Sequence, residues 1–132
     1  MKQFKKLKKK LLKRLSSDSY SFQQFSKTTN SEELLNAVKN QFVYYCSIKL
    51  IDSDLIKKYK DLFNSEKIYA NINVTDGFLL VDGDSKVSSW GNSIVYAYEN
   101  SIVHANGTSR VYAYENSTVH AYENSTVIYF RK

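Results

Sequence analysis

The sequence of 132 residues contains no proline, four glycines and a single cysteine, Cys46. One cysteine excludes an internal disulfide and a zinc site built from several cysteines, which fits a reducing compartment, and we expect a cytoplasmic protein. No apolar stretch approaches the roughly 18 residues that a membrane span needs. We also expect no cleavable signal peptide, because the apolar residues near the N-terminus are interrupted by lysines.

Acidic side chains are absent from the first 16 positions, although eight basic residues lie there. The whole chain carries 19 basic and 13 acidic residues and a formal net charge of +6, so the remainder of the chain has a net charge of −2. Apolar residues recur in this segment at steps of three and four: Phe4, Leu7, Leu11 and Leu15. This spacing predicts an amphipathic helical arm over residues 1–16, with lysines covering the face opposite the apolar stripe.

Residues 17–67 have the pattern of a helical segment. Asn30 followed by Glu33 has the spacing of a capping box, and apolar residues continue at helical intervals to Tyr45, which predicts a helix over 31–49. A second helix is expected over 54–64, with Ser53 as its cap. Residues 17–29 are rich in Ser, Gln and Thr, and we expect them to form a loop or a short irregular turn.

From Asp84 to Arg131 the chain consists of six eight-residue repeats: DSKVSSWG, NSIVYAYE, NSIVHANG, TSRVYAYE, NSTVHAYE and NSTVIYFR. The second position is always Ser, the fourth is always Val, and the sixth is small in every repeat except the last. Because side chains alternate faces along a strand, these three positions share one face. A face of small, unvarying residues predicts the interior of a repeat structure.

The repeats also alternate in kind, which gives a longer period of two octads. Gly91 matches Gly107, and His104 matches His120. A coil of two strands explains this period and predicts rungs over 84–99, 100–115 and 116–131, about 4.8 Å apart. An antiparallel meander is the alternative, but it gives no reason for every second octad to be alike. Asparagines are expected at the corners, in the left-handed conformation that a tight turn needs: Asn92, Asn100, Asn116 and Asn124.

The expected fold is therefore α+β, with N-terminal helices followed by a short two-sheet β-solenoid over residues 68–132. Three rungs are about the minimum for a stable solenoid, so both ends need to be covered. The helical segment over 17–67 is the expected cap at one end. At the other end, the apolar run from Val127 to Phe130 either covers the last rung itself or forms a homodimer.

Octads of the type Asn-Ser-Thr-Val-x-Ala-Tyr-x, as in residues 116–123, resemble those of small β-solenoid proteins encoded by bacterial phages and mobile elements. The resemblance covers residues 84–131 and does not extend to residues 1–83. It implies the solenoid architecture. Small basic proteins of such elements include anti-CRISPR inhibitors, so the resemblance also implies a compact binding module that blocks an RNA-guided nuclease or its guide RNA.

Residues able to support catalysis or to bind a metal are few. His104 and His120 would stack on one outer face, without a neighbouring Asp, Glu or Cys to complete a metal site. Glu99 and Glu115 would stack at an exposed corner, where nothing separates their pKa values as sugar hydrolysis requires. Cys46 lies within a helical pattern that fits packing better than nucleophilic attack. We expect no catalytic activity, no cofactor and no metal.

Clustered lysines favour binding to phosphates, because the contact releases counterions. The expected partner is RNA or a nucleoprotein effector, bound by residues of the basic arm: Lys6, Lys9, Lys10, Lys13 and Arg14. Outward tyrosines are expected either to form a partner surface or to stabilise the rungs by stacking on one another: Tyr96, Tyr98, Tyr112, Tyr114 and Tyr122.

Two other interpretations of the basic arm remain open. The arm would lie on an anionic membrane if its apolar stripe inserted among the lipids and its lysines met the headgroups. Alternatively, the stripe docks on the expected helices over 31–49 and 54–64, and the lysines form a solvated face. The alternative function is accordingly that of a membrane-associated or self-assembling structural protein.

Overall fold

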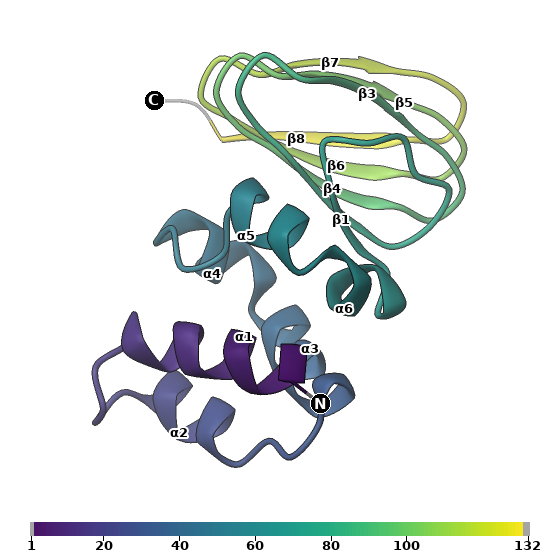
Figure 1. Cartoon of the computed structure of the whole chain (residues 1–132). Coiled ribbons are helices and arrows are strands. Elements are labelled where there is room, and N and C mark those ends of the chain that lie inside the picture. Colours follow the sequence, from purple (N-terminus) through teal and green to yellow (C-terminus); the bar gives the residue numbers. More distant parts are fainter. Residues whose placement is uncertain (1, 131–132) are drawn as a thin grey trace. The chain divides into compact units, whose positions relative to one another are not determined.

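The computed structural model describes residues 2–130, and the chain divides into two compact units, Met1–Glu66 and Lys67–Lys132. The first unit is helical and the second is a β-solenoid of parallel strands, so the fold is α+β as predicted (Figure 1). The basic segment at the N-terminus belongs to the helical unit.

Six helices make up the helical unit: α1 (Lys2–Lys13), α2 (Tyr20–Ser26), α3 (Ser31–Asn40), α4 (Phe42–Ser47), α5 (Ser53–Lys58) and α6 (Lys60–Ser65). The predicted helix over 31–49 is broken at Gln41, and the one over 54–64 is broken at Tyr59, where the backbone leaves the helical region. The predicted loop over 17–29 contains α2. Ser19 begins that helix, because its side chain accepts the N–H of Phe22.

The remaining caps agree only partly with the sequence analysis. Asn30 caps α3 as predicted by accepting the N–H of Glu33 at 2.9 Å. The Glu33 carboxylate reaches back to Thr29, whose backbone and hydroxyl hydrogen bonds lower the pKa of Glu33. The cap of α5 is Asp52 and not Ser53, since the Asp52 carboxylate accepts the N–H of Leu55 at 2.8 Å. The acidic cap is also favoured by the helix dipole.

The apolar stripe of α1 is part of the core of the protein. Phe4, Leu7 and Leu11 are 5%, 0% and 0% exposed, and α1 packs against α2. In α2, Phe25 is fully buried and its ring lies 5.4 Å from that of Tyr45 in α4. The stripe is therefore buried within the helical unit, as one interpretation expects, but the packing shown is against α2, which lies outside the two predicted helices.

Eight strands form the solenoid: β1 (Ile68–Ala70), β2 (Phe78–Val81), β3 (Lys86–Ser89), β4 (Ile94–Ala97), β5 (Ile102–Ala105), β6 (Arg110–Tyr114), β7 (Thr118–Ala121) and β8 (Thr126–Phe130). They form two parallel sheets that face each other across the coil, in the orders β1-β2-β4-β6-β8 and β3-β5-β7, and from β2 onward successive strands alternate between the sheets (Figure 1). The parallel pairing excludes the antiparallel meander.

The register confirms the period of two octads per coil. Val95 lies beside Val111 in one sheet, and Val103 beside Val119 in the other. The coil begins before the sequence repeat, because Leu79 of β2 pairs with Val95 in the same register and β1 pairs in turn with β2. Residues 76–83 are thus a divergent octad, in which Leu79 occupies the column of the conserved valines and Val81 that of the alanines.

The interior of the coil consists of the Ser, Val and Ala columns. The valines and alanines of the middle coils are fully buried: Val95, Ala97, Val103, Ala105, Val111 and Ala113. Burying hydroxyl groups is unfavourable unless they form hydrogen bonds, and those of Ser93, Ser109 and Ser117 each donate at 2.7 Å to the carbonyl three residues earlier. The narrow core is therefore filled by small side chains, and these three hydroxyls bond locally, whereas the buried Ser101 hydroxyl has no hydrogen-bond partner within residues 2–130.

The corners differ from the prediction, because the left-handed residue is the one before each asparagine or its equivalent. A positive φ occurs at the eighth position of successive octads: Gly83, Gly91, Glu99, Gly107, Glu115 and Glu123. The glutamate side chains then bond to the preceding coil. The Glu99, Glu115 and Glu123 carboxylates accept the backbone N–H of the residue 16 positions earlier, at 2.7–3.0 Å.

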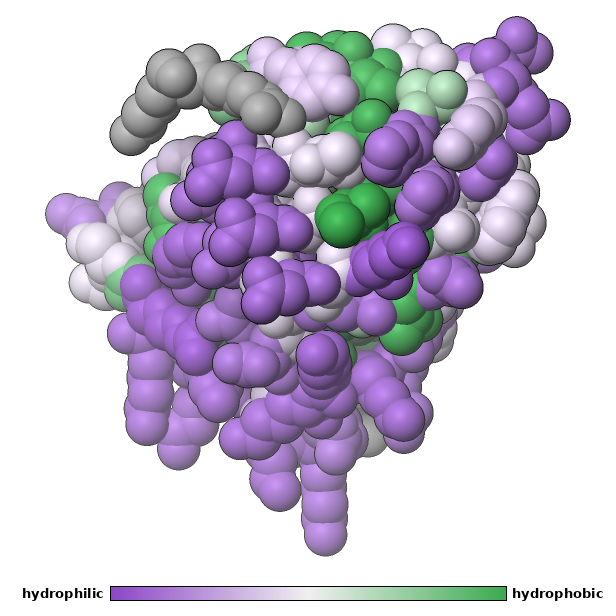
Figure 2. Space-filling view, turned by 90° about the horizontal axis from the view of Figure 1, so that it is seen from above, coloured by the Kyte–Doolittle hydropathy of each residue, from purple (hydrophilic) through white to green (hydrophobic). Residues whose placement is uncertain are grey.

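Charge is divided unequally between the two units. Residues 1–66 contain 14 basic and 7 acidic residues, whereas residues 67–132 contain 5 basic and 6 acidic residues. Figure 2 shows a face on which hydrophilic side chains predominate and apolar ones form small separate patches. The positive charge of the protein is a property of the helical unit.

Candidate nucleic-acid interface

Four lysines form an exposed row along α1. They are separated by three or four residues, so successive turns of the helix place them on one face, opposite the buried stripe. None of them forms an ion pair within residues 2–130. We call this group the lysine row: Lys2, Lys6, Lys9 and Lys13. It contains three of the five predicted phosphate-binding residues.

The other two predicted residues, Lys10 and Arg14, lie outside this row, and Lys10 lies close to Lys58 of α5. The positive charge of the neighbouring Lys58 ammonium lowers the pKa of Lys10; desolvation and Arg14 add to this effect, and Asp52 opposes it. A lowered lysine pKa means that positive charge is in excess here. We call Lys10, Arg14 and Lys58 the Lys10 cluster.

Two cations of this region bind backbone carbonyls. The Lys8 ammonium donates to the carbonyl oxygens of Ser26 and Thr28, at 3.0 and 2.7 Å. The Arg14 guanidinium donates to the carbonyl oxygen of Leu50 at 3.0 Å. These bonds join α1 to the end of α2 and to the segment before α5, where a cation stabilises carbonyl groups left without helical partners.

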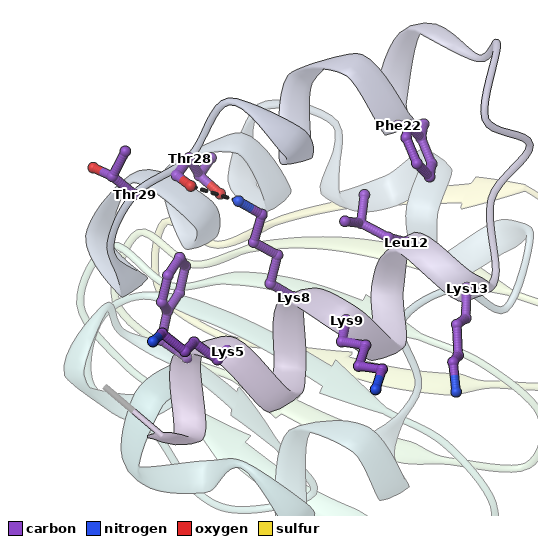
Figure 3. Close-up of a pocket in the computed structure, with 9 residues that line it drawn as sticks. Lys5, Lys8, Lys9, Leu12, Lys13, Phe22, Thr28 and Thr29 are labelled. Atoms are coloured by element: carbon purple, nitrogen blue, oxygen red, sulfur yellow. Dashed lines mark hydrogen bonds between the residues drawn. The ribbon is translucent and has the colours of Figure 1, made fainter.

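A groove of about 610 Å³ runs along α1 beside the lysine row. Leu12 of α1 and Phe22 of α2 point toward each other across it, and Lys8 reaches over to Thr28 (Figure 3). Lys9 and Lys13 point away from α2 in the same view (Figure 3). The groove therefore offers an aromatic ring next to exposed positive charge.

The structure does not place the five predicted tyrosines on one exposed surface. Tyr96 and Tyr98 are 9% and 8% exposed, Tyr112 and Tyr114 are half-buried, and Tyr122 is the most exposed of the five, at 50%. The rings stack from coil to coil, Tyr96 on Tyr112 at 5.3 Å and Tyr98 on Tyr114 at 4.8 Å between centroids. This arrangement corresponds to the alternative in which the tyrosines stabilise the rungs.

The histidines and the cysteine considered for catalysis lie in separate parts of the fold. His104 and His120 stack at 4.8 Å, and burial lowers the pKa of His104, with repulsion from His120 and Lys86 adding to the effect. Across residues 2–130, no three His, Cys, Asp or Glu side chains gather as metal ligands. Cys46 is buried.

Sequence reasoning missed two members of the candidate interface. Lys58 lies far from the arm in the sequence, and only the packing of the helical unit brings it to Lys10. Phe22 lies in the segment over 17–29 that the sequence predicts as a loop, although Ser19, three residues before it, is a recognisable cap signal. In addition, the part of the chain that the structure describes contains no helix with the length and apolar character needed to cross a bilayer.

The lysine row, the Lys10 cluster and the groove all belong to the helical unit and lie on or beside α1. Among the residues that the structure describes, the row and the cluster supply positive charge that forms no ion pair with a carboxylate, and the groove supplies an aromatic side chain. This set can bind an extended anion that has both charged and planar groups. No protein-family model matches the chain, and no match was found among the curated proteins or the solved structures.

Proposed function

We propose that this protein is a small non-catalytic binder of RNA, or of an RNA-containing complex that it inhibits. The observation that carries the proposal is the lysine row, which the fold holds on the exposed face of α1 with no carboxylate partner in the described range 2–130. An RNA-guided nuclease, the target implied by the octad resemblance, is one such complex.

The dimensions of the lysine row suit a nucleic-acid backbone. From Lys2 to Lys13 the helix rises about 16 Å at 1.5 Å per residue. One strand of a duplex carries about five phosphates over that length. The Lys10 cluster adds a second place for a phosphate, where an anion relieves the repulsion that lowers the pKa of Lys10.

The groove favours RNA with unpaired bases over a fully paired duplex. Bases that are free of a helix stack on aromatic side chains, and each such contact contributes about 1–3 kcal/mol. Phe22 is half-buried at the edge of the groove, close to the lysines of α1 that border it. A loop nucleotide would place its base against Phe22 while its phosphates contact Lys9 and Lys13.

A membrane role is less compatible with the fold. Insertion into lipid requires the apolar stripe of an amphipathic helix to be available. In α1 this stripe is buried: Phe4 is 5% exposed, and Leu7 and Leu11 are fully buried. Membrane insertion would require the helical unit to open first.

The proposal is tested by measuring binding of a fluorescent RNA hairpin by anisotropy over a series of salt concentrations. The triple variant Lys6→Gln, Lys9→Gln, Lys13→Gln should bind more weakly, and the slope of log K against log salt should decrease by about 2, because each contact contributes about 0.7. The matched control is Lys27→Gln, Lys57→Gln, Lys60→Gln, which removes the same charge from exposed positions outside α1.

The outcomes separate the alternatives. A much smaller effect of the control triple supports a site on α1, whereas equal effects would show that only net charge matters. Phe22→Leu, which retains an apolar side chain, should weaken binding of the hairpin several-fold and leave binding of a loop-free duplex unchanged. If no RNA binds at low salt while anionic vesicles do, the proposal is wrong and the membrane function takes its place.

A further inference from the structure

The last coil of the solenoid leaves one side of each sheet unpaired within residues 2–130. β7 and β8 stand at the ends of their sheets and pair only with β5 and β6, respectively (Figure 1). The N–H groups of Thr118 and Thr126 donate backward, to Ser101 and Ser109, at 2.9 Å. Because alternate residues of a parallel strand bond to opposite neighbours, the main-chain groups of Val119, Ala121 and Val127 face the open side.

Side chains at this end lose the burial that they have in the middle coils. Val103 and Val111 are fully buried, whereas Val119 and Val127 in the same columns are half-buried and Ala121 is exposed. Large apolar side chains of the last coil are 38–50% exposed: Tyr122, Ile128, Tyr129 and Phe130. The narrow apolar core of the coil is therefore partly exposed to solvent at this end.

Neither edge strand has the features that normally prevent a strand from pairing with another chain. Natural edge strands are blunted by charged side chains, proline or bulges. β7 reads TVHA and β8 reads TVIYF, and neither contains a charged Lys, Arg, Asp or Glu residue or a proline. Most of these residues favour strands, and five of the nine are β-branched.

We infer that this end binds the same end of a second copy of the chain, about a two-fold axis perpendicular to the sheets. A two-fold rotation reverses strand direction, so β7 pairs with β7 of the partner, and β8 with β8 of the partner, both antiparallel. We choose a second copy as the partner because this end of the solenoid presents two strand edges. A single peptide strand covers only one of them, whereas a second solenoid end presents two edges at the same separation.

The area of the contact indicates the affinity to expect between the two copies. A stable complex of standard size buries about 800 Å² on each partner, and an end only two strands wide offers less. Nine strand residues supply the pairing, with exposed Tyr122 and Ile128 beside them. We therefore expect a dissociation constant on the order of micromolar.

The first experiment measures the mass of the full-length protein by sedimentation velocity over a series of concentrations around 10 µM. The monomer of 15.3 kDa should double in mass as the concentration rises. Ala121→Pro removes an N–H on the open side and should give a monomer, while the matched variant Ala121→Ser, which keeps that N–H, should still dimerise. Circular dichroism melting checks that both variants fold.

A second experiment tests the two-fold symmetry. Ile128 is the central residue of β8 and is 38% exposed, so the axis places it next to Ile128 of the partner. Ile128→Lys alone and Ile128→Glu alone should each be monomeric through like-charge repulsion, and a mixture of the two should dimerise. A monomeric wild type, a dimeric Ala121→Pro variant, or a mixture that stays monomeric would each refute the interface. Assemblies that grow beyond two copies would refute the two-fold axis.

Discussion

At the scale of single residues, the corners of the solenoid balance an unfavourable backbone conformation against a hydrogen bond. Glu115 has a φ of 55°, a region that costs a residue with a side chain about 1–2 kcal/mol. Its carboxylate accepts the backbone N–H of Glu99 at 3.0 Å, and Glu99 does the same for Gly83. Each corner glutamate therefore joins its coil to the preceding one, which offsets its own strain.

Two corner glycines can be used to test the cost of a left-handed backbone at these positions. Gly83 and Gly107 have similar φ values, 62° and 66°, but a Cβ at Gly83 would meet open space, whereas at Gly107 it would lie 2.8 Å from the backbone nitrogen of Gly91. We expect Gly83→Ala to lower the free energy of unfolding by about 1 kcal/mol, and Gly107→Ala by about 3 kcal/mol because steric strain is added. Urea denaturation of both variants measures the difference, and equal losses would contradict it.

At the scale of secondary-structure elements, side-chain ladders connect equivalent strands of successive coils. Tyr98, Tyr114 and Phe130 form one stacked series, and His104 and His120 form another on the opposite sheet. Aromatic pairs on neighbouring strands stabilise a sheet beyond their buried area. In the histidine ladder this stacking comes with a cost, because two protonated rings would repel each other.

The histidine ladder should make stability depend on pH. The pKa of His104 is lowered from 6.5 by burial, then by His120 and Lys86, so below pH 6.5 the unfolded chain binds a proton at this position more readily than the folded protein. Stability contributed by neutral His104 is complete above pH 6.5 and is lost as the pH falls toward the lowered value. Denaturation at about pH 7.5 and 5.5 should show this loss, and His104→Thr should reduce it. An equal loss in the variant would rule out His104 as the cause.

At the scale of the whole molecule, the positive charge is concentrated in the helical unit. Residues 1–66 contain twice as many basic as acidic residues, while residues 67–132 are nearly balanced. Unpaired like charges attract phosphates, and they also repel one another in the folded state. The affinity for anions that we propose is therefore accompanied by a loss of stability in the absence of a ligand.

Salt should reveal this repulsion. Screening weakens interactions between exposed charges, so the free energy of unfolding should rise between low salt and about 0.3 M NaCl. The pKa of Lys10 is lowered by Lys58 and Arg14, so Lys10→Gln removes part of the repulsion. This variant should be more stable than the wild type at low salt, and its free energy of unfolding should change less with salt. Lys27→Gln is a control with the same change in net charge at an exposed position. Thermal melting at both salt concentrations measures the effects, and identical behaviour of the two variants would argue against a repulsive cluster.

The sequence alone determined the solenoid, its period of two octads per coil and the inward columns, because a repeat places the same residue types at the same positions of every coil. It also determined the amphipathic character of α1, which follows from local spacing. Only the tertiary structure decided what this helix packs against and which of its residues lie near Lys58 and Phe22. It also decided that Tyr96 and Tyr98 are buried. Likewise, the divergent octad over residues 76–83 became visible only through strand pairing. The reason is that periodicity reports one element at a time, whereas a binding surface depends on contacts between residues that are distant in the chain.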